Sequence, residues 1–238
     1  MSIPTPINPH APAEATVSPF GGRAECSSDA CAKDRIFAAA RKLFYQQGIR
    51  GVSVDAIAAE AGTTKVTLYR VFASKDDLLV QVLEDHSRRF WRWWDATVAP
   101  HAGDPRKQIE VLFESVQVCA CAEDAERGCP VANSAVEVVE EDHPARRIIL
   151  EHNAKISERL RTLCRELGAR RPEQLADALT VLMAGVFAAR LLFPHARPIG
   201  AVAEAAKALL DSPVMGAPDE RKAGEKKTDG KKRKSAVA

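Results

Sequence analysis

Hydrogen-bond donors gather in a short stretch of the chain, between Thr63 and Arg70. A helix over this stretch would expose side chains that all can donate a hydrogen bond: Thr63, Thr64, Lys65, Thr67, Tyr69 and Arg70. Such donors suit phosphate oxygens and the acceptor-rich base edges of the DNA major groove. An ordinary solvated helix face could carry a single lysine or arginine, but this face avoids carboxylates in a chain that has 32 of them. The stretch therefore favours contact with DNA.

Three helices are expected to position these donors. The apolar residues from Ile36 to Phe44 recur at helical spacing, and Gly48 can end that helix. Two shorter helices follow, Val54 to Ala61 and Thr64 to Val71, with Gly62 at the turn between them. Two short helices around a glycine-containing turn, with a preceding helix to complete a small core, match the helix-turn-helix arrangement.

Helical periodicity continues through the rest of the chain. Ser74 can cap a fourth helix that runs to about Thr97. Later helix starts are marked by a proline in the first turn: Asp104-Pro105, His143-Pro144, Arg171-Pro172 and Arg197-Pro198. Because no stretch shows the two-residue alternation of a strand, the predicted fold class is all-α.

Charge is unevenly distributed along the 238 residues, although the net charge is only +2. Residues 32–76 carry eight basic and four acidic groups, whereas residues 77–218 carry 17 and 21. The composition predicts four parts: a disordered arm over 1–31, a helix-turn-helix domain over 32–76, a helical body over 77–212 and a disordered basic tail over 213–238. The tail could add sequence-independent attraction to phosphates or serve only solubility.

The sequence also bears on the compartment. The longest nearly apolar run, Ala178 to Ala189, has 12 residues, fewer than the roughly 20 that a membrane-spanning helix needs. The first thirty residues lack the basic start and apolar stretch of a signal peptide. We therefore expect a cytoplasmic protein without a membrane partner.

Three short motifs stand between Gly48 and Leu78. They are an Ile-Ala-x-x-Ala-Gly turn at 57–62, a Leu-Tyr-x-x-Phe pattern at 68–72 and a Ser-Lys-x-x-Leu helix start at 74–78. Together they resemble the DNA-binding domain of TetR-family transcriptional regulators. Val66 stands where that family most often has Gly or Pro, so an operator sequence cannot be transferred from a relative.

The resemblance implies roles for particular residues. Thr64, Lys65, Thr67 and Tyr69 would line the recognition helix, and Ser53 and Lys75 would hold phosphates. Lys75 lies in the first turn of the fourth helix, where its ammonium and free backbone N–H groups can converge on one anion. The alternative for Tyr69 is a buried tyrosine with a satisfied hydroxyl.

The resemblance also implies a helical domain for ligand binding and dimerisation. The helix from Glu173 to Phe193 is apolar nearly all round, so it must be covered on more than one side. In a family member, this helix and the last one, Ile199 to Leu210, would pair with their copies across a two-fold axis. Burial within one subunit is the alternative. A dimer would read two halves of a palindromic operator on double-stranded DNA.

Aromatic residues at the end of the fourth helix could border a pocket for a small hydrophobic effector. The candidate lining residues are Trp91, Trp94, Phe113, Gln117, Asn133 and Phe187. Entry of a ligand there would move the fourth helix and change the separation of the two recognition helices. The alternative is that these aromatic side chains are simply core.

Two other functions, a thiol sensor and an enzyme, can be judged from the cysteines and from the catalytic motifs. Cys119, Cys121 and Cys129 could form a thiol sensor, but their spacing lacks the signature of structural zinc, and ordinary thiols are the favoured interpretation. No nucleophile elbow, phosphate-binding glycine loop or His-Glu-x-x-His pattern is present, so neither an enzyme nor a cofactor is expected. The remaining alternatives are a redox-sensing regulator of the same fold and a non-specific architectural DNA-binding protein.

Overall fold

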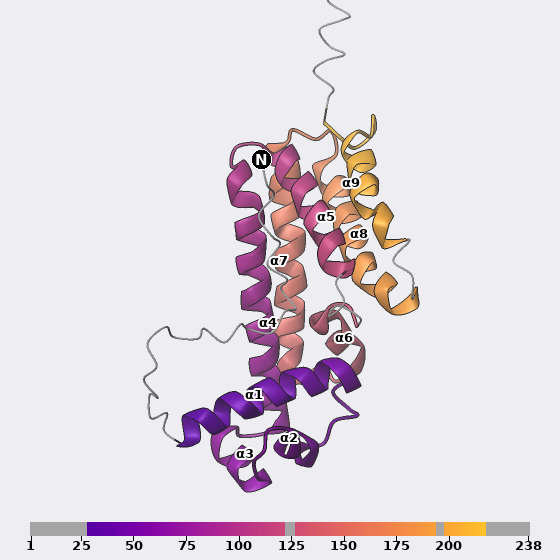
Figure 1. Ribbon diagram of the computed structural model, residues 1–238. Helices are drawn as coiled ribbons and strands as arrows, with labels where there is room; N and C mark the ends of the chain where they lie inside the picture. The colour runs from indigo at the N-terminus through magenta and orange to yellow at the C-terminus, as the bar shows by residue number, and fades with distance from the viewer. Residues whose placement is uncertain (1–27, 122–126, 194–197, 218–238) are drawn as a thin grey trace, which may run out of the picture.

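The computed structural model describes residues 28–121, 127–193 and 198–217, and every regular element in these ranges is a helix. The predicted all-α fold class is therefore confirmed. The helices form a small N-terminal group at one end of a long bundle (Figure 1).

The N-terminal group consists of α1 (Ser28–Gln47), α2 (Val54–Glu60) and α3 (Lys65–Val71). Gly48 ends α1 with a φ of +81°, a left-handed conformation that glycine adopts without a Cβ clash. The three helices enclose a core of fully buried side chains, among them Ile36, Ile57 and Leu68. The core fixes the angle at which α3 leaves the turn after α2.

The bundle begins with α4 (Lys75–Val98), a helix that starts within the N-terminal group and continues into the body. Figure 1 shows α4 and α7 side by side along the body, with α5, α8 and α9 on one side of them. The remaining bounds are α5 Pro105–Cys121, α6 Pro130–Glu137, α7 Pro144–Glu166, α8 Pro172–Leu192 and α9 Val202–Leu210, with 3-10 turns at Ala99–His101 and Ile199–Ala201.

Aromatic rings of α4 pack in the bundle between α4 and α7. Phe90 lies with its ring centroid 5.3 Å from that of Trp93 and 4.8 Å from that of His152 on α7. Trp91 and Trp94 are also buried, and their centroids are 5.6 Å apart. These rings join α4 to α7, which makes α4 the common support of the N-terminal group and the body.

Three sequence expectations need correction. The helix starts predicted from prolines do not include Pro130, but this residue begins the helix α6. Helix α1 begins at Ser28, inside the predicted arm 1–31, and residues 1–27 of that arm lie outside the described residues. The predicted tail 213–238 also starts too early, because Gly216 is buried and its carbonyl accepts a bond from Arg170 N; residues 218–238 are not described.

Helix α8 is longer than the apolar run from which we expected no membrane-spanning segment. Within the described ranges, its length and apolar composition alone would allow it to cross a membrane. A core helix of a soluble protein meets the same criterion, and α8 packs against α5, α7 and α9. The composition of α8 is therefore weak evidence for a membrane span.

Candidate nucleic-acid interface

Side-chain caps define where the two helices of the turn begin. Ser53 Oγ accepts a bond from Ala56 N (3.1 Å) at the start of α2, and Thr64 Oγ1 accepts one from Thr67 N (3.2 Å) at the start of α3. The hydroxyls of Thr64 and Thr67 lie 3.0 Å apart, so one of their two protons is used between them. The pair can therefore offer one O–H donor outwards, and Ser53 can offer its own.

Lys65 extends from the first turn of α3 towards α2. Its Nζ lies 3.1 Å from Asp55 Oδ2, and both side chains are more than half exposed. Exposed ion pairs of this kind stabilise a protein by about 0–1 kcal/mol, so the ammonium can exchange Asp55 for a phosphate at low cost. The pairing holds the lysine at the helix start without removing it from the surface.

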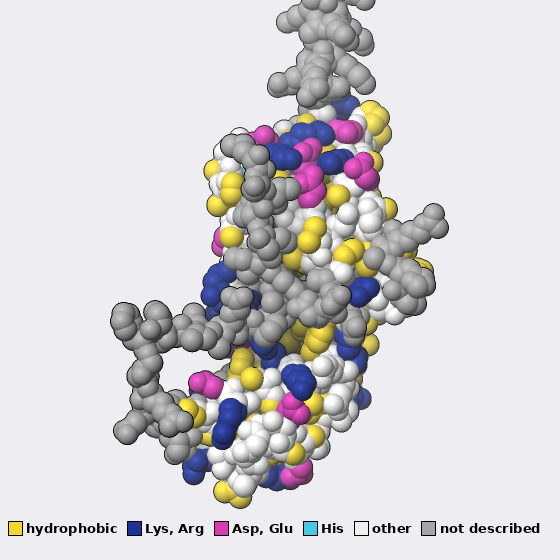
Figure 2. All heavy atoms as spheres, viewed as in Figure 1, with side chains coloured by type: hydrophobic (Ala, Val, Ile, Leu, Met, Phe, Trp, Pro, Cys, Tyr) yellow, Lys and Arg dark blue, Asp and Glu magenta, His cyan; other side chains and the backbone are white. Residues whose placement is uncertain are grey.

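The outer face of α3 has the exposure that the sequence predicts for most of its donors. Lys65 and Arg70 are exposed, as is Tyr69 at 47%, which excludes the buried alternative for the tyrosine. Thr63 and Thr67 are half-buried. In Figure 2, lysine and arginine side chains are spread as separate groups over the end of the molecule that α1–α3 form.

Val66 is an outward-facing residue that sequence reasoning did not include. Its side chain is 79% exposed at the start of α3, between Lys65 and Thr67. An apolar side chain at such a position can contact the methyl group of thymine in the major groove. It stands two residues before the buried Leu68, about 200° away around the helix, and this spacing was the signal that could have identified it.

Lys75 lies at the start of α4, where the sequence places it, but its ammonium is partly engaged. Its Nζ donates to Ile49 O over 2.6 Å, and the bond is partly buried. An ammonium has three donors, so two remain for other acceptors. Lys75 thus ties α4 to the end of α1 and can still face an anion.

Arg50 connects the N-terminal group to α6 of the body. Its backbone N donates to Glu137 Oε2 (2.9 Å), and its Nε donates to Glu137 O (3.2 Å). Its guanidinium also lies 3.3 Å from a carboxylate oxygen of Glu140. A backbone hydrogen bond lowers the pKa of Glu140, and the charge of Arg50 lowers it further, whereas burial acts in the opposite direction. The end of α6 therefore holds the loop between α1 and α2.

The six residues predicted to line a ligand pocket lie in different parts of the body. Trp91 borders a surface recess between α4 and α7, where Lys155 Nζ stands 4.4 Å from its ring centroid. Gln117 Oε1 accepts from Ala203 N at α9 (3.2 Å). Phe113, Trp94 and Phe187 are buried. Asn133 borders a different cavity, next to α1, and is the one member of the six that does so among the described residues.

The cysteines of the body differ in exposure. Cys119 is buried and Cys121 is exposed, as expected for residues two apart on one helix. Cys129 is buried with Sγ 4.0 Å from His86 Nε2, and burial raises the pKa of its thiol. Burial raises the pKa of Cys164 to about 12. Because the thiolate is the reactive form, these two buried thiols are disfavoured as sensors.

Comparison with known proteins identifies the N-terminal helices. A family model described as "Bacterial regulatory proteins, tetR family" matches residues 36–82. The chain is 30% identical over 107 residues to the HTH-type transcriptional regulator EthR of Mycolicibacterium smegmatis, covering 43% of this chain and 49% of that protein. It is 24% identical over 135 residues to an uncharacterised HTH-type regulator of Lactococcus lactis, covering 55% of this chain and 69% of that protein.

Solved structures extend the similarity to the body. The TetR-family regulator SCO4454 of Streptomyces coelicolor aligns with a TM-score of 0.66 at 26% identity, over 75% of this chain and 94% of that one. A transcriptional regulator of Saccharomonospora viridis, solved in complex with choline, shares the fold with a TM-score of 0.66 at 19% identity, over 77% and 97% of the two chains. Because the capped turn and the exposed α3 agree with the family model and with these relatives, we conclude that the chain belongs to the TetR family of DNA-binding transcriptional regulators.

Proposed function

We propose that the protein is a homodimeric repressor that binds a palindromic operator through α3 and leaves it when a small molecule binds. The observation that carries the proposal is the outer face of α3, which presents donors and one apolar side chain without a carboxylate. This is the chemistry needed to read base edges in the major groove. Regulation of this kind requires binding and no catalytic step.

The proposed DNA contacts fall into two groups. Thr64, Lys65, Thr67 and Tyr69, joined by Val66, would face the groove. Thr63 and Arg70 would flank them, and Ser53 and Lys75 would hold phosphates at two helix starts. Phosphate contacts fix the position of the protein on the duplex, whereas base-edge contacts determine which sequence it prefers.

The exposed face of α8 supports a homodimer. Val181 and Leu192 are 72% and 71% exposed, and Ala184 and Ala188 lie exposed between them. A Cβ added at Gly185 would meet nothing within 4 Å, so a second helix could approach the backbone closely there. A contiguous apolar face of this kind marks an interaction site on a soluble protein.

A second copy is the occupant that fits this face best. The groove beside it, between α8 and α9, is also lined mainly by apolar residues, including Ala178, Ala205 and Ala208. One helix-turn-helix unit contacts few bases, whereas two units on a two-fold axis read half-sites about 34–36 Å apart or a multiple of that distance. The dimer thus accounts both for the apolar face and for specific DNA binding.

The ligand part of the proposal rests on cavities beside α4. A structural neighbour holds choline, so a protein of this fold can accept a small molecule. In this chain a cavity lies between α1, α4 and α6, in contact with the helices that carry α3. A regulator that meets DNA directly is expected in the cytoplasm.

Selection of bound fragments from random duplexes tests the DNA part of the proposal. We expect an inverted repeat whose half-sites are separated by one helical turn or a multiple of it. Removal of residues 218–238, which leaves the packed segment up to residue 217 in place, should lower affinity for all duplexes without changing the selected sequence. Equal binding to selected and scrambled duplexes would instead favour a non-specific architectural protein.

Sedimentation analysis tests the dimer. Val181→Glu places a charge in the apolar face of α8 and should give monomers. Val118→Glu is the matched control, because Val118 is a 53% exposed valine on α5. A dimer that survives the change at Val181 but not the one at Val118 would place the interface on another face.

A further inference from the structure

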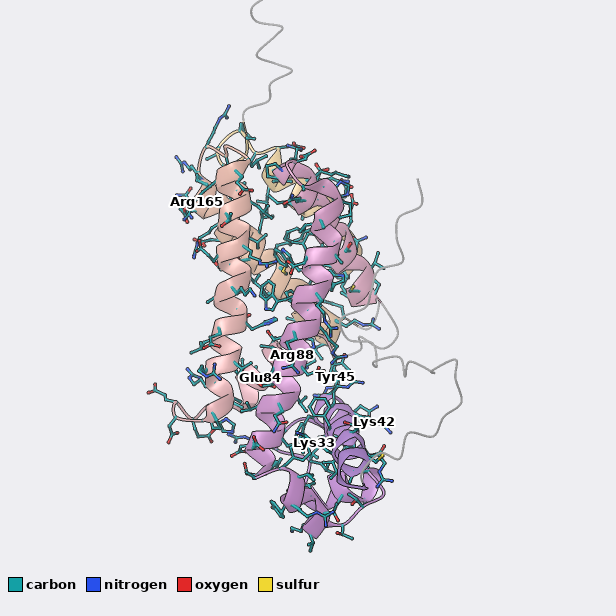
Figure 3. All side chains as sticks on the ribbon, turned by 90° about the vertical axis from the view of Figure 1, so that its left-hand side faces the viewer. Lys33, Lys42, Tyr45, Glu84, Arg88 and Arg165 are labelled. Atoms are coloured by element: carbon teal, nitrogen blue, oxygen red, sulfur yellow. The ribbon has the colours of Figure 1, made fainter. Side chains whose placement is uncertain are left out.

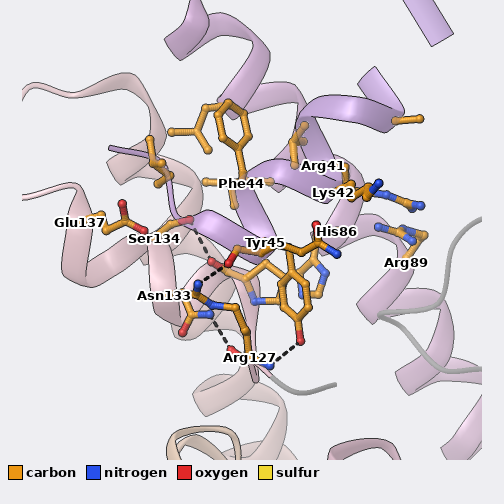
Figure 4. Close-up of a pocket in the computed structure, with 17 residues that line it drawn as sticks. Arg41, Lys42, Phe44, Tyr45, His86, Arg89, Arg127, Asn133, Ser134 and Glu137 are labelled. Atoms are coloured by element: carbon orange, nitrogen blue, oxygen red, sulfur yellow. Dashed lines mark hydrogen bonds between the residues drawn. The ribbon is translucent and has the colours of Figure 1, made fainter. Parts of the chain in front are cut away.

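A cavity of about 630 Å³ lies between α1, α4 and α6, where the N-terminal group meets the body (Figure 4). Its size falls within the roughly 300–1,000 Å³ of small-molecule sites. It differs from the aromatic pocket that the sequence predicts, because it opens beside the helix-turn-helix instead of within the bundle. Of the predicted pocket residues, Asn133 borders it.

The walls of this cavity combine an apolar surface with positive charge. The apolar part is formed by side chains of α1, of α4 and of the turn that follows α1: Phe44, Ile49, Leu79, Val82 and Leu83. Among the described lining residues, four side chains are cationic and one is a carboxylate: Arg41, Lys42, Arg89 and Arg127 against Glu137. An apolar body and an anionic group in one ligand would match both features.

The four cations differ in how they are engaged. Lys42 Nζ lies 2.6 Å from Glu60 Oε1, and the Arg127 guanidinium donates to Gln46 O over 2.5 Å. Arg89 pairs with Asp85 of its own helix (3.0 Å), whereas Arg41 forms no ion pair with a residue in the described ranges. Figure 4 shows Arg41, Lys42 and Arg89 on the same side of the cavity.

Arg41 and Arg89 repel each other across this side. Burial lowers the pKa of Arg89, and the charge of Arg41 lowers it further, although Asp85 acts in the opposite direction. Two guanidinium groups held close together in a partly dry site favour an anion between them, because it offsets the repulsion and accepts their hydrogen bonds.

We propose that this cavity binds a small amphipathic anion, with an apolar body against Phe44 and Leu83 and a carboxylate or comparable group between Arg41 and Arg89. The regulatory role of this site rests on the proposed function, whereas the binding itself does not. The proposal replaces a purely hydrophobic effector with a charged one, and places it at the junction of the two domains.

The cavity has a direct connection to the helix-turn-helix. Asn133, Ser134 and Glu137 of α6 border it, and Glu137 also accepts the bond from Arg50 N in the loop that leads to α2. On the other side, Arg127 N donates to Tyr45 Oη of α1 (3.0 Å). A bound molecule thus touches both domains, and it can shift their relative orientation if it fits one orientation better.

Calorimetric titration of the full chain, without DNA, tests the site. The probes are decanoate and 2-naphthoate, each compared with its neutral amide, decanamide or 2-naphthamide. We expect at least one carboxylate to bind saturably at one site per chain, about tenfold or more tighter than its amide, since hydrogen bonds to charged groups are the stronger ones. Absence of saturable binding by both carboxylates overturns the proposal, as does equal affinity for acid and amide.

Arginine variants test the position of the anion. Arg41→Gln and Arg89→Gln should each weaken carboxylate binding about tenfold and leave the amide unchanged. Arg88→Gln is the matched control, because Arg88 also pairs with Asp85 but is 64% exposed on α4 and does not border the cavity (Figure 3). Equal losses for Arg88→Gln and Arg89→Gln would overturn the assignment. If Arg89→Gln unfolds in a thermal melt, the result for Arg41→Gln decides.

The two proposals can fail independently. If a carboxylate binds as expected but no inverted repeat is preferred over scrambled DNA, the site stands and the repressor proposal fails. If a palindrome is preferred but neither carboxylate binds, the repressor proposal stands and the charged site fails.

Discussion

Replacing Lys75 by methionine separates a structural role of this residue from a role in DNA binding. The change removes the ammonium and keeps a similar apolar stem. In the free protein, the ammonium donates to Ile49 O over 2.6 Å, and Ile49 is 8% exposed, so the carbonyl would lose its donor in a half-buried position. A lost bond of this kind lowers the free energy of unfolding by about 1–2 kcal/mol.

On DNA, the same change should remove one phosphate contact from each protomer. The logarithm of the binding constant falls with the logarithm of salt concentration by about 0.9 for each phosphate that is neutralised. Lys75→Met should therefore reduce that slope by about 0.9 per protomer and weaken binding to all duplexes alike. Lys207→Met is the matched control, since Lys207 is a partly exposed lysine on α9 that pairs with Glu114.

Two measurements decide between the roles. Urea denaturation gives the free energy of unfolding, and fluorescence titrations at several salt concentrations give the slope. An unchanged slope would refute the phosphate contact, even if affinity falls, because loss of folded protein alone would lower affinity without altering the slope. An unchanged free energy of unfolding would refute the contribution of the bond to Ile49.

Further predictions concern the recognition helix, the core and the glycine turns. Val66→Ala should weaken binding about tenfold to operators with thymine at the contacted position, because about 0.8 kcal/mol is lost for each of the two carbons removed. The melting temperature of the protein should not change. Competition between base variants of the selected operator measures the effect. Burial lowers the pKa of His152 from 6.5 to about 4, so below pH 6.5 the unfolded chain takes up a proton at this residue before the folded chain does. The free energy of unfolding should therefore be highest, as far as this group is concerned, above pH 6.5 and should fall by about 3 kcal/mol between pH 6.5 and pH 4. In His152→Phe, the part of the pH dependence due to this group should be absent from urea titrations between pH 4 and 7. Gly128→Ala should unfold at clearly lower urea than Gly62→Ala, because both have positive φ but a Cβ at 128 would stand 2.4 Å from Phe187 O and one at 62 would meet nothing within 4 Å.

Helix starts could be predicted from the sequence because caps act over three residues. Ser53, Thr64 and Ser74 each accept a bond from a backbone N–H within their own segment, so the neighbouring residues contain the information. Helix α6 was missed for the same reason. Cys129 stands at its N-cap and makes no side-chain cap bond, so Pro130 was the one local sign of a helix start.

Features that depend on packing could not be predicted in this way. The spacing from the buried Leu68 indicates that Val66 faces away from the core, but its exposure of 79% also depends on how α3 sits on the core. The cavity brings Arg41, Arg89 and Asn133 together from three helices, and Arg50 meets Glu137 across 87 positions of sequence. Periodicity identifies the apolar stripe of each helix but does not show which polar residues of different helices will converge.

Because α4 is one continuous helix, a rotation at its far end is transmitted to its start. Its 24 residues span about 36 Å without a proline or glycine, so no hinge separates its two ends. A tilt of about 5° around the far end would carry the start of α4, and α3 with it, about 3 Å sideways, close to the 3.4 Å spacing of neighbouring base pairs. In a dimer with two-fold symmetry, opposite displacements of the two α3 helices would add, which would move both helices out of register with the base pairs.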